Sequence, residues 1–171
     1  MNILIEAAQD GSREAFEGIF NNLSNKLFAF ASVRTSSRDD ALDVVQETFI
    51  DLWKAIPGFS YQSDEQFYGF VFKIARRKLY KYYKDKKCTV PLDETTDVGY
   101  EEMNPRDFRY MLRELGGLSE KYRELIHLRY WSGMSFSEIA QILDVREGTA
   151  KVWHHRAIKK LQVTMQKYEN R

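Results

Sequence analysis

Hydrophobic residues recur through most of this chain at intervals of three and four, the spacing that places side chains along one face of an α-helix. A first stripe of this kind extends from Phe16 to Phe30, and Ser12 stands before it as an expected N-cap. We find no convincing run of alternating apolar and polar residues, which would indicate a strand. The predicted fold class is therefore all-α.

Two more helices are predicted in the first half of the chain from their start and stop signals. Ser37 with Asp40, and Ser63 with Gln66, both have the spacing of a capping box, in which two side chains satisfy free N–H groups of the first turn. Pro57, which is followed by a glycine, ends the first of these two helices.

A different arrangement is predicted near the C-terminus. A helix over 118–131, capped by Ser119, precedes a short helix opened by Ser135 and Glu138, the sharpest capping-box match in the chain. After a tight turn at Asp144 comes a longer, basic helix. This is the layout of a helix-turn-helix, whose second helix can enter the major groove of DNA. Taken alone, the basic residues would fit a solvated helix end equally well.

Charge is strongly segregated along the chain. The 171 residues carry a formal net charge of +1, yet residues 73–87 and the last third are basic, while the stretch between them is acidic and interrupted by proline and glycine. We therefore predict two small helical domains, 1–88 and 111–171, joined by an acidic linker at 89–110. Two basic blocks around an acidic one indicate two anion-binding surfaces on one molecule.

The segment FYGFVFKIARRKLYKYYKDKK, residues 67–87, interleaves basic residues with many aromatic ones. Exposed rings can stack on unpaired bases, and neighbouring cations neutralise phosphates. Core packing is the interpretation favoured for Phe70, Val71 and Ile74. Contact with single-stranded or melted DNA is favoured for Arg76, Lys81, Tyr83 and Lys84.

The helix before that segment has an acidic face beside an apolar one. Its acidic residues are Asp40, Asp43, Glu47 and Asp51, and its large apolar residues include Phe49, Leu52 and Trp53. Such a helix could dock a partner helix, or it could combine core packing with solvated charge, and the residues alone favour the second interpretation. Because the acids would repel DNA, any partner on this face should be a protein.

Other function classes have less support. Cys88 is the single cysteine, which excludes an internal disulfide and fits a reducing compartment. We find neither a signal peptide nor an apolar segment long enough for a bilayer, so we expect a soluble cytoplasmic protein. No nucleophile–base pair, P-loop or metal-ligand cluster is present at motif spacing, so we expect neither an enzyme nor a metal site.

Three segments together resemble the extracytoplasmic-function (ECF) group of sigma-70-type RNA polymerase sigma factors. DALDVVQETFIDLWKAI, residues 40–56, is similar to the family's core-polymerase-binding segment. Residues 67–87 resemble the segment that melts and reads the minus-ten promoter element, and residues 118–161 resemble the helix-turn-helix that reads the minus-thirty-five element. The resemblance covers nearly the whole chain, and three such segments in this order are highly specific.

The resemblance implies a factor that binds the clamp helices and flap of core RNA polymerase and directs promoter recognition, DNA melting and transcription initiation. It implies no cofactor, no membrane partner and a monomer when free, and an anti-sigma factor is a common partner in the family. The residues implied at the polymerase are Asp43, Gln46, Glu47, Phe49, Leu52 and Trp53.

The resemblance also implies two sets of DNA contacts. The loop 58–65 would capture a flipped base of the non-template strand. The residues implied at the minus-ten element are Phe59, Tyr61, Arg76, Arg77, Tyr80, Lys81, Tyr83 and Lys84. Those implied at the minus-thirty-five element are Arg146, Thr149, Lys151, Val152, His155, Arg156 and Lys160.

Five positions depart from the family pattern. Phe70 and Arg77 stand where the family often has Trp and Asn, so the usual base preference downstream is in doubt. Asp144 replaces a turn glycine, which Asp can do because it tolerates left-handed geometry. Arg146 replaces a capping Ser, and His154 replaces a core Leu, whose space the neighbouring Trp could fill.

Two alternatives to a sigma factor remain at this point. A stand-alone helix-turn-helix regulator would explain the C-terminal helices but would leave the face from Asp43 to Trp53 unused. A sigma-like decoy that binds an anti-sigma factor would have less need of the aromatic residues in 67–87.

Overall fold

The computed structural model describes residues 1–86 and 115–169, and within them it contains seven α-helices and one short 3-10 turn. The predicted all-α fold is confirmed, since no strand occurs in these two ranges. The predicted linker at 89–110 lies outside the described residues. The elements are α1 (Asn2–Gln9), α2 (Arg13–Ser32), α3 (Arg38–Ala55), η1 (Ile56–Gly58), α4 (Asp64–Lys86), α6 (Glu120–Tyr130), α7 (Phe136–Leu143) and α8 (Glu147–Glu169).

Helices α1 to α4 pack around one apolar core, and local signals set where they begin. The Ser12 hydroxyl accepts a hydrogen bond from the Ala15 amide at 3.1 Å, which caps α2, and Ser37 caps α3 in the same way. At the centre of the core, Phe30 of α2 meets Phe72 of α4 edge to face at 5.1 Å. Helix α1 was not predicted, because its eight residues offer a short apolar pattern.

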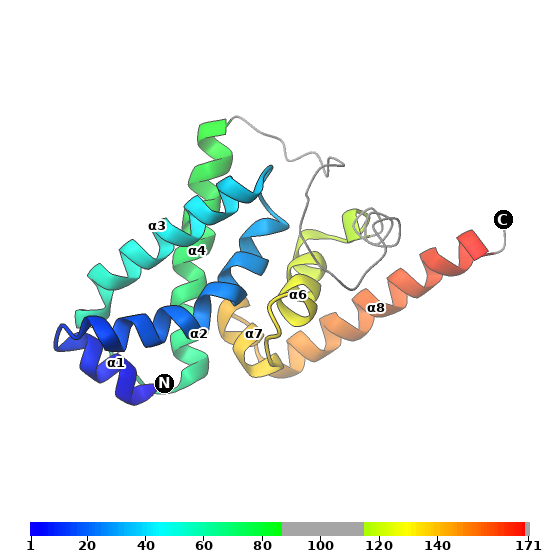
Figure 1. Cartoon of the computed structure of the whole chain (residues 1–171). Helices are drawn as coiled ribbons and strands as arrows, with labels where there is room; N and C mark the ends of the chain where they lie inside the picture. Colours follow the sequence, from blue (N-terminus) through cyan, green and yellow to red (C-terminus); the bar gives the residue numbers. More distant parts are fainter. Residues whose placement is uncertain (87–114, 170–171) are drawn as a thin grey trace.

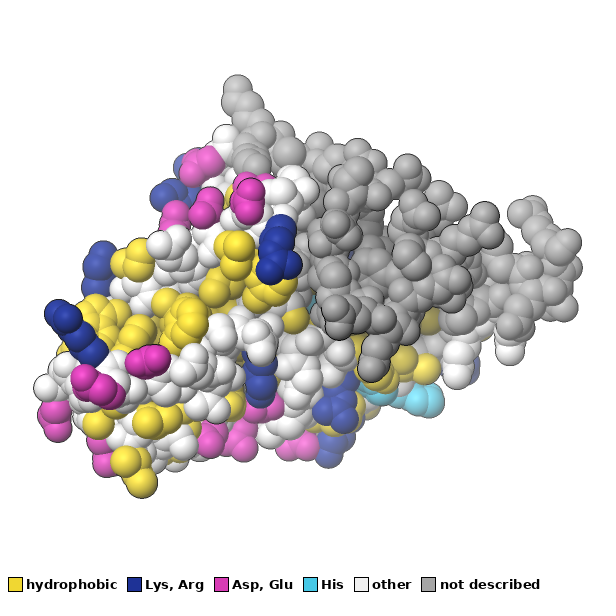
Figure 2. Space-filling view, in the orientation of Figure 1, with side chains coloured by type: hydrophobic (Ala, Val, Ile, Leu, Met, Phe, Trp, Pro, Cys, Tyr) yellow, Lys and Arg dark blue, Asp and Glu magenta, His cyan; other side chains and the backbone are white. Residues whose placement is uncertain are grey.

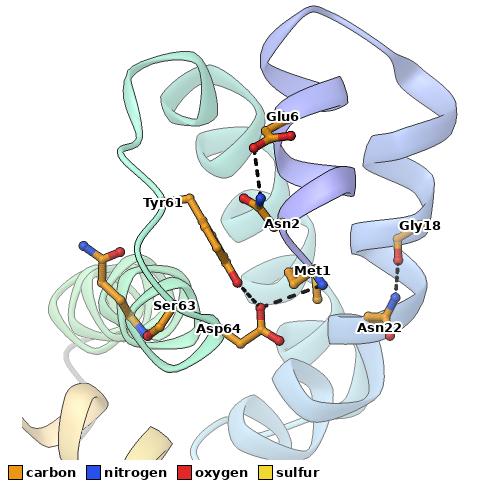
Figure 3. Close-up of polar contacts among 9 residues, drawn as sticks. Met1, Asn2, Glu6, Gly18, Asn22, Tyr61, Ser63 and Asp64 are labelled. Atoms are coloured by element: carbon orange, nitrogen blue, oxygen red, sulfur yellow. Dashed lines mark hydrogen bonds and ion pairs between the residues drawn. The ribbon is translucent and has the colours of Figure 1, made fainter.

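The connection from α3 to α4 is held against the N-terminus by polar contacts. The Gln9 side chain donates to the carbonyl oxygens of Ile56 and Phe59 at 3.1 and 2.6 Å. The Tyr61 hydroxyl donates to Asp64 at 2.6 Å, and the N-terminal amine lies 3.8 Å from the same carboxylate (Figure 3). The loop before α4 is therefore fixed at both ends by residues far away in the sequence.

Helices α6, α7 and α8 form the predicted helix-turn-helix. Ser135 and Glu138 make both hydrogen bonds of a capping box, so that prediction is confirmed. Asp144 ends α7 with φ of 57°, the left-handed geometry expected of a residue that replaces glycine there. Ser119 stands at the N-cap position of α6 as predicted, but its side chain makes no capping hydrogen bond.

Helix α4 also joins the two halves, since α7 lies against it (Figure 1). None of the helices in the described ranges has an apolar stretch of the length required to span a lipid bilayer.

The difference between the two serine caps predicts a difference in stability. Ser135→Ala should lower the free energy of unfolding by about 1 kcal/mol, because the Glu138 amide loses its acceptor. Ser119→Ala is the matched control and should cost much less, since Ser119 makes no capping bond. Urea unfolding followed by circular dichroism measures both, and equal losses would contradict this assignment of the caps.

Candidate functional site

An exposed apolar surface runs along α2 and α3 (Figure 2). Phe20, Ile50 and Trp53 are 42%, 47% and 37% exposed, which is unusual for side chains of this size. Trp53 packs edge-on against Phe16 at 4.8 Å, so its ring is held in a fixed position. Sequence reasoning missed Phe20 and Ile50. Ile50 lies one helical turn before Trp53 on α3, whereas Phe20 lies on α2 and meets α3 through its ring contact with Phe49.

Two residues expected in contact with polymerase are buried instead. Phe49 and Leu52 are 5% and 0% exposed. Phe49 packs against Phe20 with ring centroids 4.6 Å apart. These two side chains therefore support the exposed surface from beneath.

The acidic rim of this surface is partly fixed by a lysine from another helix. Asp43 and Gln46 are exposed on α3. Lys78 of α4 lies 2.6 Å from Asp51 and 3.4 Å from Glu47. The hydrogen bond from Lys78 lowers the pKa of Asp51 and raises the pKa of Lys78 itself, so both stay charged at neutral pH.

The loop before α4 presents two aromatic side chains. Phe59 stacks on Phe70 at 4.7 Å and meets Phe67 edge to face at 5.5 Å. Tyr61 is tied to Asp64, and that hydrogen bond raises the pKa of Tyr61 to about 12. Both rings are partly buried, so their positions are set before any ligand arrives.

Helix α4 divides its residues between the core and the surface. Val71 and Ile74 are buried as predicted, while Phe70 is only partly buried. The exposed residues that were expected at DNA include Arg77, Tyr80, Lys81 and Lys84, and Tyr80 is 73% exposed. Their arrangement brings a stacking ring and three cations together on one helix.

Two other residues of α4 that were expected at DNA, Tyr83 and Arg76, make polar contacts with other parts of the protein. The Tyr83 hydroxyl donates to the Arg34 carbonyl at 2.9 Å, and burial raises the pKa of Tyr83. Arg76 lies with its Nε 3.2 Å from Glu124 of α6 and donates to the Ile142 carbonyl of α7 at 3.2 Å. The Tyr83 hydroxyl is thus engaged, whereas the Arg76 side chain remains 45% exposed while it makes these two contacts.

The expected upstream DNA surface lies on α8. Val152 is 47% exposed, and the exposed cations beside it include Lys151 and Arg156. His155 is also exposed, whereas Thr149 is partly buried in the first turn. Lys160 lies 5.2 Å from the Tyr122 ring centroid.

His154 holds α8 against α6 and α7. Its Nε2 is 2.9 Å from the Tyr130 hydroxyl, with the two rings stacked, and Phe136 meets it edge to face at 5.2 Å. Trp153 packs instead against Tyr122, at 6.4 Å. The polar residue that replaces a core leucine is thus accommodated by a hydrogen bond at the edge of the core.

A buried histidine, His127 of α6, was not singled out from the sequence. It is 4% exposed, and neither ring nitrogen has a hydrogen-bond partner within the described residues. Burial lowers its pKa well below the ordinary 6.5, and the charges of Arg34 and Arg123 act in the same direction. His127 is therefore neutral at physiological pH.

Both halves of the chain are similar to known families. Residues 19–88 match the family described as Sigma-70 region 2, and residues 108–161 match Sigma-70, region 4. The chain is 26% identical over 167 residues to the ECF RNA polymerase sigma factor BldN of Streptomyces coelicolor. The matched region covers 92% of this chain and 63% of that protein. It is 28% identical over 165 residues to the ECF RNA polymerase sigma-E factor of Haemophilus influenzae, covering 86% of each.

A solved structure shows the same architecture. The sigma factor RpoE from Bartonella quintana, in complex with the anti-sigma factor NepR, is similar with a TM-score of 0.68 and 26% sequence identity. The similarity covers 88% of this chain and 96% of that one.

The neutral state of His127 predicts a pH dependence of stability. The His127 side chain binds a proton near pH 6.5 in the unfolded chain but stays neutral in the native state. Its contribution to the free energy of unfolding is therefore fully present above that pH and decreases as the pH falls below it. Between pH 7.5 and 5.5 the wild type should lose about 1.4 kcal/mol through this group. In His127→Leu this part of the loss should disappear.

The control for this measurement is His155→Gln, which changes an exposed histidine on α8. It should keep the loss of stability that is assigned to His127, because the buried histidine is unchanged in this variant. Urea unfolding at several pH values compares the three proteins. An equal slope in His127→Leu and in the wild type would show that the prediction is wrong.

Proposed function

The chain belongs to the ECF group of sigma-70-type RNA polymerase sigma factors, and on that premise we propose that it binds core RNA polymerase and directs promoter recognition, DNA melting and transcription initiation. It acts as a cytoplasmic binding factor, without catalysis or a cofactor of its own. The observation that carries the proposal is the presence of three separate surfaces of different chemistry, on α2–α3, on α4 and on α8.

The surface on α2 and α3 is the one proposed for polymerase. Its exposed centre is Ile50 and Trp53, and Asp43 and Gln46 lie on its polar rim. Large aromatic side chains surrounded by polar residues are typical of interface hot spots. The acidic rim disfavours DNA and suits basic or polar groups on the clamp helices.

The surface on α4 is proposed to hold the minus-ten element as it melts. Tyr80 offers an exposed ring for stacking, while Arg77, Lys81 and Lys84 supply charge for phosphates. The loop 58–65, which is held by Gln9 at one end and by the N-terminal amine at the other, is proposed to receive a flipped base. Base stacking contributes about 1–3 kcal/mol per base, which offsets part of the cost of unpairing.

The surface on α8 is proposed to read the minus-thirty-five element in the major groove. Lys151, Val152, His155 and Arg156 lie in its first two to three turns, the part of a recognition helix that meets base edges. Arg146, just before α8, and the more distal Lys160 are assigned to phosphates. The DNA surfaces on α4 and α8 each bind weakly alone. Once polymerase holds them at a fixed separation, the second contact becomes intramolecular and the promoter is bound more tightly.

The exposed face on α3 distinguishes a sigma factor from a stand-alone DNA-binding regulator. A stand-alone DNA-binding regulator has no use for the exposed face around Ile50 and Trp53, so co-purification with core polymerase distinguishes it from a sigma factor. Because the Bartonella quintana relative was solved with an anti-sigma factor, we include such a factor among the proposed partners of this chain.

The polymerase surface yields a direct test. Trp53→Ala should weaken binding to purified core polymerase roughly tenfold or more, because it removes the largest exposed ring of the surface. Ile3→Ala is the control, since Ile3 is 80% exposed on α1, away from the α3 ring contacts. Fluorescence anisotropy with labelled protein measures both affinities. Equal behaviour of the two variants would count against the proposed docking face.

The minus-ten surface predicts a separation between binding and melting. Tyr80→Ala and Lys84→Ala should reduce open-complex formation roughly tenfold while changing initial promoter binding far less, because their targets are unpaired bases and the backbone beside them. Tyr83→Phe keeps the ring and removes only the bond to Arg34, so it serves as the control. Permanganate footprinting detects melting, and an unchanged footprint in Tyr80→Ala would refute this role.

A further inference from the structure

The loop 58–65 begins where the chain leaves the 3-10 turn η1 through Phe59, whose backbone is extended. The Phe59 amide still donates to the Ile56 carbonyl at 3.0 Å, but an extended residue has no helical partner for its own carbonyl oxygen. Gln9 of α1 supplies that partner, because its Nε2 donates to the Phe59 carbonyl at 2.6 Å and to the Ile56 carbonyl at 3.1 Å. One half-buried amide of α1 therefore fixes the start of this loop.

The two hydrogen bonds from Gln9 also determine where the Phe59 ring lies. This ring stacks on Phe70 at 4.7 Å and meets Phe67 edge to face at 5.5 Å. Since Phe67 is completely buried, the ring contact connects the loop to the core. Without the Gln9 donor, both carbonyls would have to turn toward water to find a partner, and the Phe59 ring would move with its backbone.

The other end of the loop is held by Asp64, the first residue of α4. The Tyr61 hydroxyl donates to this carboxylate at 2.6 Å, so its ring is directed toward the start of α4, and the N-terminal amine lies 3.8 Å from the same group (Figure 3). A carboxylate repels DNA phosphates, so we assign its role to the ring that it holds. The exposed Ser60 and Gln62, which can donate and accept hydrogen bonds, lie on either side of Tyr61 in the loop.

We propose that Gln9 and Asp64 are positioning residues for promoter opening, which fix the rings of Phe59 and Tyr61 where a flipped base is received and do not touch DNA themselves. The base then meets a loop that is already ordered, so less conformational entropy is lost on binding. Helix α1 thereby contributes to reading the minus-ten element, although none of the three proposed surfaces includes it. The inference rests on the proposed function, because it assumes that the loop 58–65 receives the base.

A set of DNA probes with single missing bases tests this role. Run-off transcription on a promoter library first supplies a promoter that the wild-type chain uses with core polymerase. The probe is this promoter with its minus-ten element mismatched, so that removal of a base does not change the cost of melting. Single abasic sites are placed along the non-template strand, and the affinity of the holoenzyme is measured by gel shift in the presence of heparin. At the captured base, the abasic site should weaken binding by the wild type roughly tenfold.

Two variants of Gln9 should abolish most of that effect. Gln9→Glu and Gln9→Met both remove the amide donor, the second without adding charge. In each, the tenfold loss at the captured position should shrink to about twofold or less, because a displaced loop no longer holds that base. Losses at the other positions should remain. Asn22→Asp is the matched control, since this exposed amide of α2 donates only within its own helix, to the Gly18 carbonyl at 2.7 Å (Figure 3).

This measurement separates positioning from a purely structural role. A variant that is only less stable lowers all affinities by the same factor and leaves the ratio between intact and abasic probes unchanged. An unchanged tenfold loss in both Gln9 variants would refute the proposal. A wild-type affinity that no abasic site alters would also refute it, because the loop would then receive no base.

Asp64 provides a second test at the other end of the loop. Asp64→Asn keeps an oxygen that accepts the Tyr61 hydrogen bond, whereas Asp64→Ala leaves that hydroxyl without its acceptor. The asparagine variant should therefore retain most of the tenfold loss at the captured position, and the alanine variant should lose most of it. Equal effects of the abasic site in the two variants would refute the positioning role of Asp64.

Run-off transcription by the wild-type chain with core polymerase separates this inference from the proposed function. Failure to make any promoter-dependent transcript would refute the function itself. Normal transcription combined with unchanged effects of the abasic sites in both Gln9 variants would refute the positioning role alone.

Discussion

Burial of the apolar face of α4 holds the N-terminal helices together and at the same time determines what the other face of that helix presents. Phe67, Val71 and Phe72 are completely enclosed, and each such side chain contributes about 1.5–3 kcal/mol relative to an exposed position. Since the rotation of α4 is set by these contacts, Tyr80 and Lys81 must face outward. The proposed DNA surface is therefore a consequence of core packing.

Charge is distributed so that neighbouring helices serve different partners. Lys78 reaches from the basic helix α4 to Glu47 and Asp51 on the acidic helix α3. The two carboxylates are 49% and 43% exposed, and ion pairs with partners as exposed as these contribute at most about 1 kcal/mol. We infer that the main effect of this contact is to orient the Glu47 and Asp51 carboxylates, which form the acidic rim beside the exposed ring of Trp53.

Local signals made several elements predictable. The capping box of Ser135 and Glu138 and the left-handed turn at Asp144 depend on residues within a few positions of each other, so the sequence contains the whole interaction. Site exposure was harder to predict. Phe49 and Trp53 occur on the same helix and are both large and apolar, yet the first is 5% exposed and the second 37%, because the packing of α2 decides which of them it covers.

By itself, the amino-acid sequence determined the helical class and the positions of most helix starts, because these follow from residue spacing and from short-range hydrogen bonds. It also indicated the family, through the resemblance of three segments to known sigma-factor segments. Only the tertiary structure decided that Arg76 pairs with Glu124, that Tyr83 bonds to the Arg34 carbonyl and that α7 meets α4 at a glycine. Those contacts join residues 48 or more positions apart. Their formation depends on how whole helices pack, and no local pattern encodes that geometry.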